Sequence, residues 1–289
     1  IIFDSNGGNE VAAITQDYGT VVSEPADPEK AAYVFDGWYT DNETFSLPFE
    51  FTTVTENITL YAKWADHPGT EGLVYTLIYD EYYVTGYSGT ATEVVVPLMY
   101  NGKNVTYIYN NAFKDKNITC ISIGNNIKNI GGNAFDGCSL SKITIPDSIT
   151  KIENYTFVNC SSLNQITIPD NVTSIGEGAF YGCTALTKVV IPNGLVHINQ
   201  GLFYNCSSLS EVIIGSGTTM IYNMAFGGCS SLSKVYYNGT AEQFALVNIY
   251  TSQNTYFLNA TKYFYSETEP TEEGNYWHYD TDGITPIIW

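Results

Sequence analysis

The sequence predicts a β-rich solenoid that carries one parallel strand in each repeat of about 23 residues. Phenylalanine recurs through the middle of the chain at intervals of 22, 22, 23, 23 and 23 residues, at positions 113, 135, 157, 180, 203 and 226. Cysteine follows nearly the same spacing, at positions 138, 160, 183, 206 and 229. Short β-branched segments recur every 23 residues, at positions 143–145, 166–168, 189–191 and 212–214. Because self-similarity at a fixed period is the signature of stacked repeats, these three series together predict the fold class.

The first part of each repeat has the pattern Leu-x-x-Ile-x-Ile, which predicts a short strand with one buried face. Proline follows the strand in three repeats, at Pro146, Pro169 and Pro192. It ends the strand because proline has no amide donor for the ladder. A pair of apolar residues three apart comes next, as in Ile149 and Ile152, and it predicts a tight extended or 3₁₀-like turn.

The residue before each cysteine of the series is always glycine or asparagine, the two types that enter left-handed backbone at little cost. A turn residue with positive φ is therefore expected at positions 137, 159, 182, 205 and 228. A single repeat buries too few side chains to offset the entropy of ordering its backbone. The repeats must therefore stack on one another and share one core.

The repeat resembles the 23-residue leucine-rich repeat of the BspA-like family, which has the same Ile-x-Ile-Pro, Ala-Phe and Gly-Cys positions. The resemblance covers roughly residues 73–237, and it implies an α/β horseshoe-type leucine-rich-repeat solenoid. The pattern is altered at both ends, where Lys116 stands at the cysteine position and Gly215 at the proline position.

The segment before the repeats has landmarks of its own, at 3–8 (FDSNGG), 35–39 (FDGWY) and 60–64 (LYAKW). These landmarks resemble the Listeria–Bacteroides repeat of the internalin B-repeat type, which implies a small β-grasp-like domain of bacterial surface proteins. Charge divides the chain in the same way: the formal net charge of −19 splits into −10 for residues 1–66, −3 for 67–239 and −6 for 240–289.

We therefore expect a β-grasp-like domain at 1–65, a linker at 66–72, the solenoid with an N-terminal β cap at 73–239, and a C-terminal cap at 240–289. Within the last segment, Thr240 and Gln243 form a capping box that predicts a short helix through about Asn248. Strands are expected at 261–265 and 276–279, with a turn at 280–283. The C-terminal cap should cover the last open strand edge, which otherwise invites strand addition.

Composition excludes several classes of function. The chain has 11 lysines, no arginine and 30 acidic residues, so a nucleic-acid partner is not expected. No apolar stretch approaches the ~18 residues needed to cross a bilayer, so no membrane insertion is expected. Aromatic residues (15%) outnumber charged residues (14%), which is typical of a folded chain.

The outward face of the strand row is the best candidate for a partner-binding site. Its outward positions become apolar toward the C-terminal repeats, and the candidate residues are Lys188, Val190, Glu211, Ile213, Lys234 and Tyr236. An exposed apolar row on a solenoid is a plausible docking site. Two alternatives remain: the C-terminal cap folds over this row, or its β-branched residues only favour strand formation.

No catalytic, cofactor-binding or metal site is predicted. The five cysteines of the repeat column are expected to be buried free thiols, because neighbours in a column have parallel side chains, a poor geometry for disulfides. Cys120 lies on the outward face of its strand and is expected to be a free thiol, but no histidine is expected beside it as the base that a catalytic nucleophile needs. The histidines His67, His197 and His278 fall in unrelated segments, and Asp280–Gly283 fits a turn better than a calcium loop.

The resemblance implies a non-enzymatic bacterial cell-surface or secreted protein, extracellular and monomeric, that adheres to a host or neighbouring-cell protein or glycan. The alternative is a structural spacer that holds another module away from the cell wall.

Overall fold

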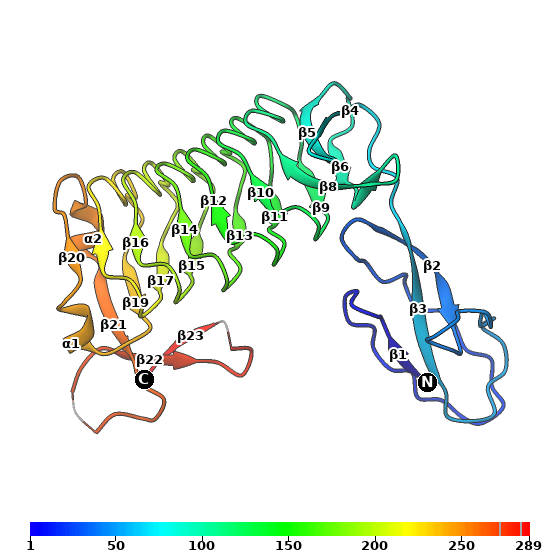
Figure 1. Ribbon diagram of the computed structural model, residues 1–289. Helices are drawn as coiled ribbons and strands as arrows, with labels where there is room; N and C mark the ends of the chain where they lie inside the picture. Colours follow the sequence, from blue (N-terminus) through cyan, green and yellow to red (C-terminus); the bar gives the residue numbers. More distant parts are fainter. Residues whose placement is uncertain (272, 284) are drawn as a thin grey trace.

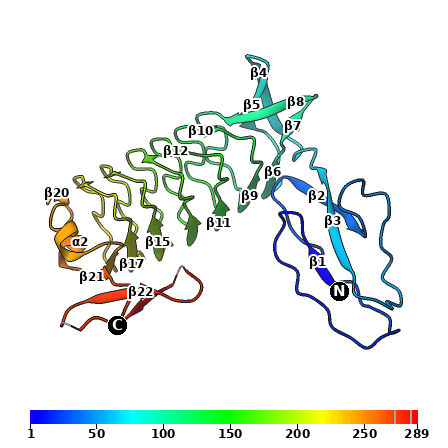
Figure 2. The same cartoon turned by 60° about the horizontal axis from the view of Figure 1, so that its bottom comes forward.

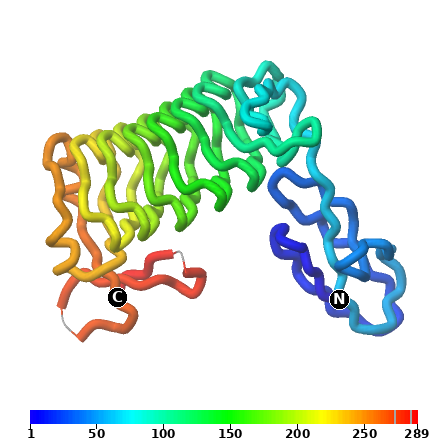
Figure 3. The backbone as a smooth tube through the Cα atoms, viewed as in Figure 1, coloured from blue at the N-terminus to red at the C-terminus, as the bar shows by residue number. Residues whose placement is uncertain are grey.

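A computed structural model describes residues 1–271, 273–283 and 285–289, and shows a coil of stacked turns between two smaller β units (Figure 1). The backbone tube in Figure 3 follows one turn after another through the middle of the chain. The predicted solenoid of about 23 residues per turn is confirmed.

The long strands of successive turns lie parallel to one another. Within each sheet they pair in register, as in Lys142 with Gln165 and Ile143 with Ile166. Each prolyl residue of the series follows a strand directly or after one residue, as predicted. These strands are β6 (Glu93–Val96), β9 (Cys120–Ile123), β11 (Lys142–Thr144), β13 (Gln165–Thr167), β15 (Lys188–Ile191), β17 (Glu211–Ile214), β19 (Lys234–Tyr237) and β21 (Thr261–Tyr265).

A second row of short parallel strands lies where the sequence indicated only an extended or 3₁₀-like turn. The turns are stacked at the spacing of a β-ladder, so any extended segment meets its equivalent in the next turn and pairs with it. The row comprises β8 (Lys103–Ile108), β10 (Asn129–Ile130), β12 (Lys151–Ile152), β14 (Ser174–Ile175), β16 (His197–Ile198), β18 (Met220–Ile221) and β20 (Asn248–Ile249). Each turn of the coil therefore contributes one long strand and one short strand.

The core is a stack of phenylalanine rings, one from each turn. Neighbouring rings from Phe113 to Phe226 have centroids 5.3–5.5 Å apart and interplanar angles of 2–18°. Phe257 continues the stack at 4.7 Å from Phe226, although it comes from the C-terminal cap and not from a repeat. The ring of Phe257 therefore covers Phe226, the last phenylalanine of the repeats, and separates it from solvent.

The predicted positive φ before each cysteine is confirmed: Gly137, Asn159, Gly182, Asn205 and Gly228 have φ between +57° and +74°. A second left-handed position occurs in each turn, and the sequence did not predict it because its residue types vary. It is occupied by Asn111, Asn133, Tyr155, Gly178, Gly201 and Met224.

Glycine and asparagine alternate in the column before the cysteines for a packing reason. A Cβ on Gly182 would lie 2.7 Å from Oδ1 of Asn159 in the preceding turn. A Cβ on Gly137 would meet Oδ1 of Asp115 at the same distance, and one on Gly228 would meet Asn205. Each side chain of the column therefore occupies the space that the next glycine leaves empty.

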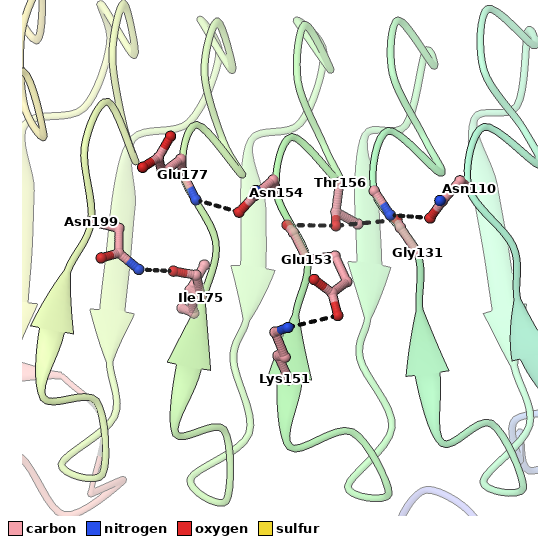
Figure 4. Close-up of polar contacts among 10 residues, drawn as sticks. Asn110, Gly131, Lys151, Glu153, Asn154, Thr156, Ile175, Glu177 and Asn199 are labelled. Carbon is pink, nitrogen blue, oxygen red and sulfur yellow. Dashed lines mark hydrogen bonds and ion pairs between the residues drawn. The ribbon is translucent and has the colours of Figure 1, made fainter.

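Polar side chains link neighbouring turns on the second sheet (Figure 4). Asn154 Oδ1 accepts a hydrogen bond from the Glu177 amide at 2.9 Å. Asn199 Nδ2 donates to the Ile175 carbonyl at 2.6 Å. These contacts satisfy backbone groups that the two-residue strands leave unpaired.

The cysteine column is buried, and each of its thiols donates to a phenylalanine carbonyl of the preceding turn, at sulfur–oxygen distances of 3.0–3.3 Å. All six cysteines of the chain are free, and Cys120 alone is exposed. Burial raises the pKa of Cys138 and of Cys229 to about 12, and it raises the pKa of Cys183 well above the ordinary value. These thiols therefore fill space and are not reactive.

The N-terminal unit is a three-stranded sheet of order β1-β3-β2, in which β1 (Ile2–Asp4) is parallel and β2 (Tyr33–Tyr39) antiparallel to β3 (Thr59–Asp66). Trp38 and Leu60 form its core together with Phe3. It contacts the solenoid where the Ala32 amide donates to Ser122 Oγ at 3.1 Å.

The hairpin of β4 (Leu73–Ile78) and β5 (Glu81–Tyr87) covers the first turn, and β7 (Met99–Tyr100) pairs with β8. At the other end, the capping box of Thr240 and Gln243 is present, but the helix α1 (Ala241–Phe244) is shorter than expected. It stops before Asn248 because residues 248–249 pair with β18. The helix α2 (Thr255–Asn259) was not expected.

The expected strands at 261–265 and 276–279 are present, as β21 and β22 (Tyr276–Tyr279). The sequence favours a solvated hairpin between them, with acidic residues at Glu267, Glu269, Glu272 and Glu273, but the two strands pair in parallel and the connection is a crossover. Glu267, Glu269 and Glu273 are described, and Glu272 lies outside the described residues. The strand β23 (Pro286–Ile288) then forms an antiparallel hairpin with β22.

The alternation of glycine and asparagine can be tested with two glycines. We expect Gly201→Ala to lower the free energy of unfolding by about 1 kcal/mol, which is the cost of an alanine in left-handed backbone. No steric overlap adds to this cost, because the nearest atom to the added Cβ is 3.9 Å away. Gly182→Ala should lower the free energy of unfolding by ~2–3 kcal/mol, because its added Cβ has the same backbone strain and also overlaps the Asn159 side chain. Urea unfolding of the unchanged chain, of Gly182→Ala, of Asn159→Gly and of the double variant gives a double-mutant cycle. The backbone strain at residue 182 cancels in this cycle, so the coupling energy measures the overlap with the Asn159 side chain alone. A coupling energy of zero would contradict this packing.

The buried thiols predict sensitivity to alkali. The unfolded chain releases thiol protons above about pH 8.5 while the fold retains them, so the free energy of unfolding should fall as pH rises from there toward 12. Each buried thiol contributes up to ~1.4 kcal/mol per pH unit, so Cys183→Ala should make the decline shallower. Urea unfolding between pH 7 and 10.5 measures both slopes.

Alkylation with iodoacetamide tests the burial of the thiols directly. In the native protein it should modify one cysteine, Cys120, and in urea it should modify all six. Rapid modification of all six cysteines in the native state would show that the cysteine column is open to solvent.

Candidate partner-binding surface

Outward side chains of the long strands form two rows along the solenoid, one residue from each strand in each row. Within the sheets the members of a row pair in register. The first row is Glu93, Cys120, Lys142, Gln165, Lys188, Glu211 and Lys234. The second row is Val95, Ser122, Thr144, Thr167, Val190, Ile213 and Tyr236.

The apolar end of the second row is not exposed, so this part of the sequence prediction is wrong. Ile213 and Tyr236 are each only 1% exposed, and Val190 is half-buried. The β22–β23 hairpin lies over them, which is the alternative that the sequence left open (Figure 1). The physical reason is that a contiguous apolar row on a strand face stabilises the fold most when a segment of the same chain covers it.

Trp277 of β22 is the centre of this cover. It is fully buried between Tyr236 and Tyr265, with both ring centroids 5.5 Å away. Its indole Nε1 donates to the Tyr237 carbonyl at 3.0 Å. Burial raises the pKa of Tyr236. Sequence reasoning missed Trp277 as a partner of the row, although a tryptophan in a short strand-like segment is itself a signal that a large apolar surface needs a partner.

The charged members of the predicted site lie at the edge of this cover. Lys234 Nζ is 3.1 Å from Glu211 Oε1, and both side chains are partly exposed. The hydrogen bond with Glu211 raises the pKa of Lys234. Lys188 is half-buried and in register with Glu211. Whether Lys188, Glu211 and Lys234 contact a partner stays a prediction.

The uncovered part of the strand face lies on β9, β11 and β13. Cys120, Lys142, Thr144, Gln165 and Thr167 are all exposed there. Figure 2 shows the hairpin below the C-terminal half of the coil and the N-terminal domain below the other end. The open face is therefore a polar surface between two folded units, and it can accept a partner that supplies hydrogen bonds and charge.

The other side chains considered for chemistry do not converge. His67 Nδ1 accepts from the Gly69 amide at 2.9 Å, His197 packs edge-on against Tyr222, and His278 stacks on Trp289. Oxygens of Asp280 and Asp282 accept hydrogen bonds from Thr281 and Thr285 within their own turn. Across the described residues no group of three or more His, Cys, Asp or Glu could hold a metal ion. No helix in the described part of the chain is long and apolar enough to span a membrane.

Solved structures of leucine-rich-repeat proteins are similar to the chain. A leucine-rich-repeat protein of T. pallidum is 30% identical to the chain with a TM-score of 0.55, and the match covers 58% of this chain and 83% of that protein. A leucine-rich-repeat protein of Bacteroides ovatus is 18% identical with a TM-score of 0.45, over 68% of this chain and 70% of that protein.

Two curated relatives match a short stretch of the chain. A Gly-rich protein and a second protein of Evansella cellulosilytica, both named as membrane proteins, are 46% and 45% identical over 65 residues. The match covers 22% of this chain, and it spans 8% and 10% of the length of these relatives.

Family models match both parts of the chain. The BspA-type leucine-rich-repeat region matches residues 106–233 in six copies, and the Listeria–Bacteroides repeat domain matches residues 1–63. BspA-like leucine-rich-repeat proteins are surface proteins, and such repeats typically build non-enzymatic scaffolds. The chain belongs to the BspA-type leucine-rich-repeat proteins, and its first 63 residues carry a Listeria–Bacteroides repeat domain.

Proposed function

We propose that this protein is a non-enzymatic extracellular adhesion protein that holds a host or neighbouring-cell protein or glycan on its open strand face. One observation carries the proposal: the outward face of β9, β11 and β13 is exposed and polar, while the equivalent face of β17 and β19 is covered by the chain itself. A solenoid offers such a face on a rigid support, since each turn is fixed by its neighbours.

The proposed location, at the cell surface or secreted, is supported by the family and by the two curated relatives that are named as membrane proteins. The proposed division of the chain places the β-grasp-like domain at 1–65, the linker at 66–72, the solenoid at 73–239 and the C-terminal cap at 240–289. In this arrangement the N-terminal domain and the C-terminal hairpin border the binding face.

A structural spacer is the second candidate. The stretch of 65 residues that the chain shares with two curated relatives forms only 8–10% of their length, and this supports a role as one module of a long surface protein. In a spacer the open strand face would bind no partner, and its polar side chains would serve only to keep the protein soluble.

The two roles are separated by a binding panel. We expect the labelled full chain to be retained by at least one member of a panel of extracellular-matrix proteins, mucins, glycans and epithelial cells. Thr144→Glu with Thr167→Glu should reduce retention at least tenfold, because two carboxylates on the open face disrupt a complementary surface.

Thr150→Glu with Thr173→Glu is the matched control, since these two exposed threonines of neighbouring turns lie near the second sheet. Equal loss of retention in both double variants would contradict the open face as the binding site. Retention by no member of the panel would favour the spacer.

A further inference from the structure

Among the described residues, two lysines of the outward strand face, Lys142 on β11 and Lys188 on β15, form no ion pair or hydrogen bond. In the part of the chain that the structure describes, eight ammonium groups form ion pairs or hydrogen bonds, at positions 30, 63, 103, 114, 128, 151, 234 and 262. Three have neither, and they belong to Lys116, Lys142 and Lys188. Two of these three lie in the first outward row of the strand face.

Lys142 and Lys188 lie on either side of Gln165. Lys142 pairs in register with Gln165, and β13 lies beside β15, which carries Lys188 one repeat further on. Strands spaced about 4.8 Å apart put the two lysine Cα atoms roughly 10 Å from each other. Their long flexible stems allow both ammonium groups to reach one anion above Gln165.

The acidic groups of the row do not neutralise this pair. Glu211 is in register with Lys188 but forms its ion pair with Lys234, and Glu93 lies beyond Cys120. The face between β11 and β15 therefore carries an uncompensated positive charge on a chain of net charge −19. An anionic group of a ligand would neutralise this positive charge.

The remaining side chains of the face favour a sugar over a protein. Thr144, Thr167 and Gln165 present hydroxyl and amide groups, which match the hydroxyl groups of a saccharide. The face has no exposed aromatic or aliphatic anchor of the kind that dominates protein interfaces. The charge of the whole chain repels long polyanions, so the ligand should carry isolated carboxylates.

We propose that Lys142 and Lys188 bind the carboxylate of a single acidic sugar at the end of a glycan, of the sialic acid type. Gln165, Thr144 and Thr167 then hydrogen-bond to the hydroxyl groups of the same sugar. This assignment rests on the proposed function and names the chemistry of its partner.

The test compares polymers that display 3′-sialyllactose or lactose, which differ only in the acidic sugar, by surface binding of the full chain at 50 and 300 mM salt. We expect the sialylated polymer to bind at least tenfold more tightly than the neutral one, with weaker binding at high salt. Lys142→Gln with Lys188→Gln should lose about tenfold in affinity, a loss of about 1.4 kcal/mol. Lys142→Arg with Lys188→Arg should retain binding.

Lys116→Gln is the matched control, because it removes the third unpartnered ammonium group away from the strand row. Equal binding of the two polymers, or equal loss in Lys116→Gln and the double variant, would overturn the proposal. Lysine-dependent binding of poly-glutamate without binding of 3′-sialyllactose would assign the row to acidic peptides instead. If the panel finds a ligand on the open face while both polymers fail to bind, the adhesion function stands and the sugar assignment falls.

Discussion

Register between successive turns is the constraint on which this structure depends. Each turn places a phenylalanine ring about 5.4 Å from the ring before it and a thiol on the carbonyl of that earlier phenylalanine. Both contacts fit only if the chain reverses at the same point in every turn, and the left-handed residue before the cysteine provides this reversal. A slip of one residue would point the apolar side chains of a strand at water. The fixed register also creates the outward rows, because residues of equivalent position then lie side by side along the molecule.

Close stacking makes the turns interdependent beyond the core. The asparagine of one turn fills the space left by the glycine of the next, as Asn159 does at Gly182, so the effective packing unit spans two repeats. The two kinds of turn are therefore not interchangeable, and an inserted repeat would fit only in the correct alternation. The same interdependence makes the strand face rigid, which suits a surface that presents several weak polar contacts to one ligand.

The C-terminal hairpin divides the strand face into two parts with different roles. Over β17 and β19 the outward residues are apolar and are covered by Trp277, so they hold the last strands in place. Over β9, β11 and β13 most outward residues are polar and exposed, and Lys142 there forms no ion pair. A covered apolar face on β17 and β19 and an open polar face on β9, β11 and β13 thus occur along one solenoid, on two different sheets.

The sequence by itself determined the repeat length, the parallel strands, the column of left-handed turns and the buried free thiols, because each of these is a local property repeated at a fixed spacing. It also identified the row that includes Val190, Ile213 and Tyr236, but it did not decide whether that row faces water. The tertiary structure decided this, because the cover comes from Trp277, 41 residues after Tyr236 in sequence. Contacts between segments that share no repeat pattern depend on how the chain returns in space. For the same reason the seventh ring of the stack, Phe257, was seen only in the folded molecule.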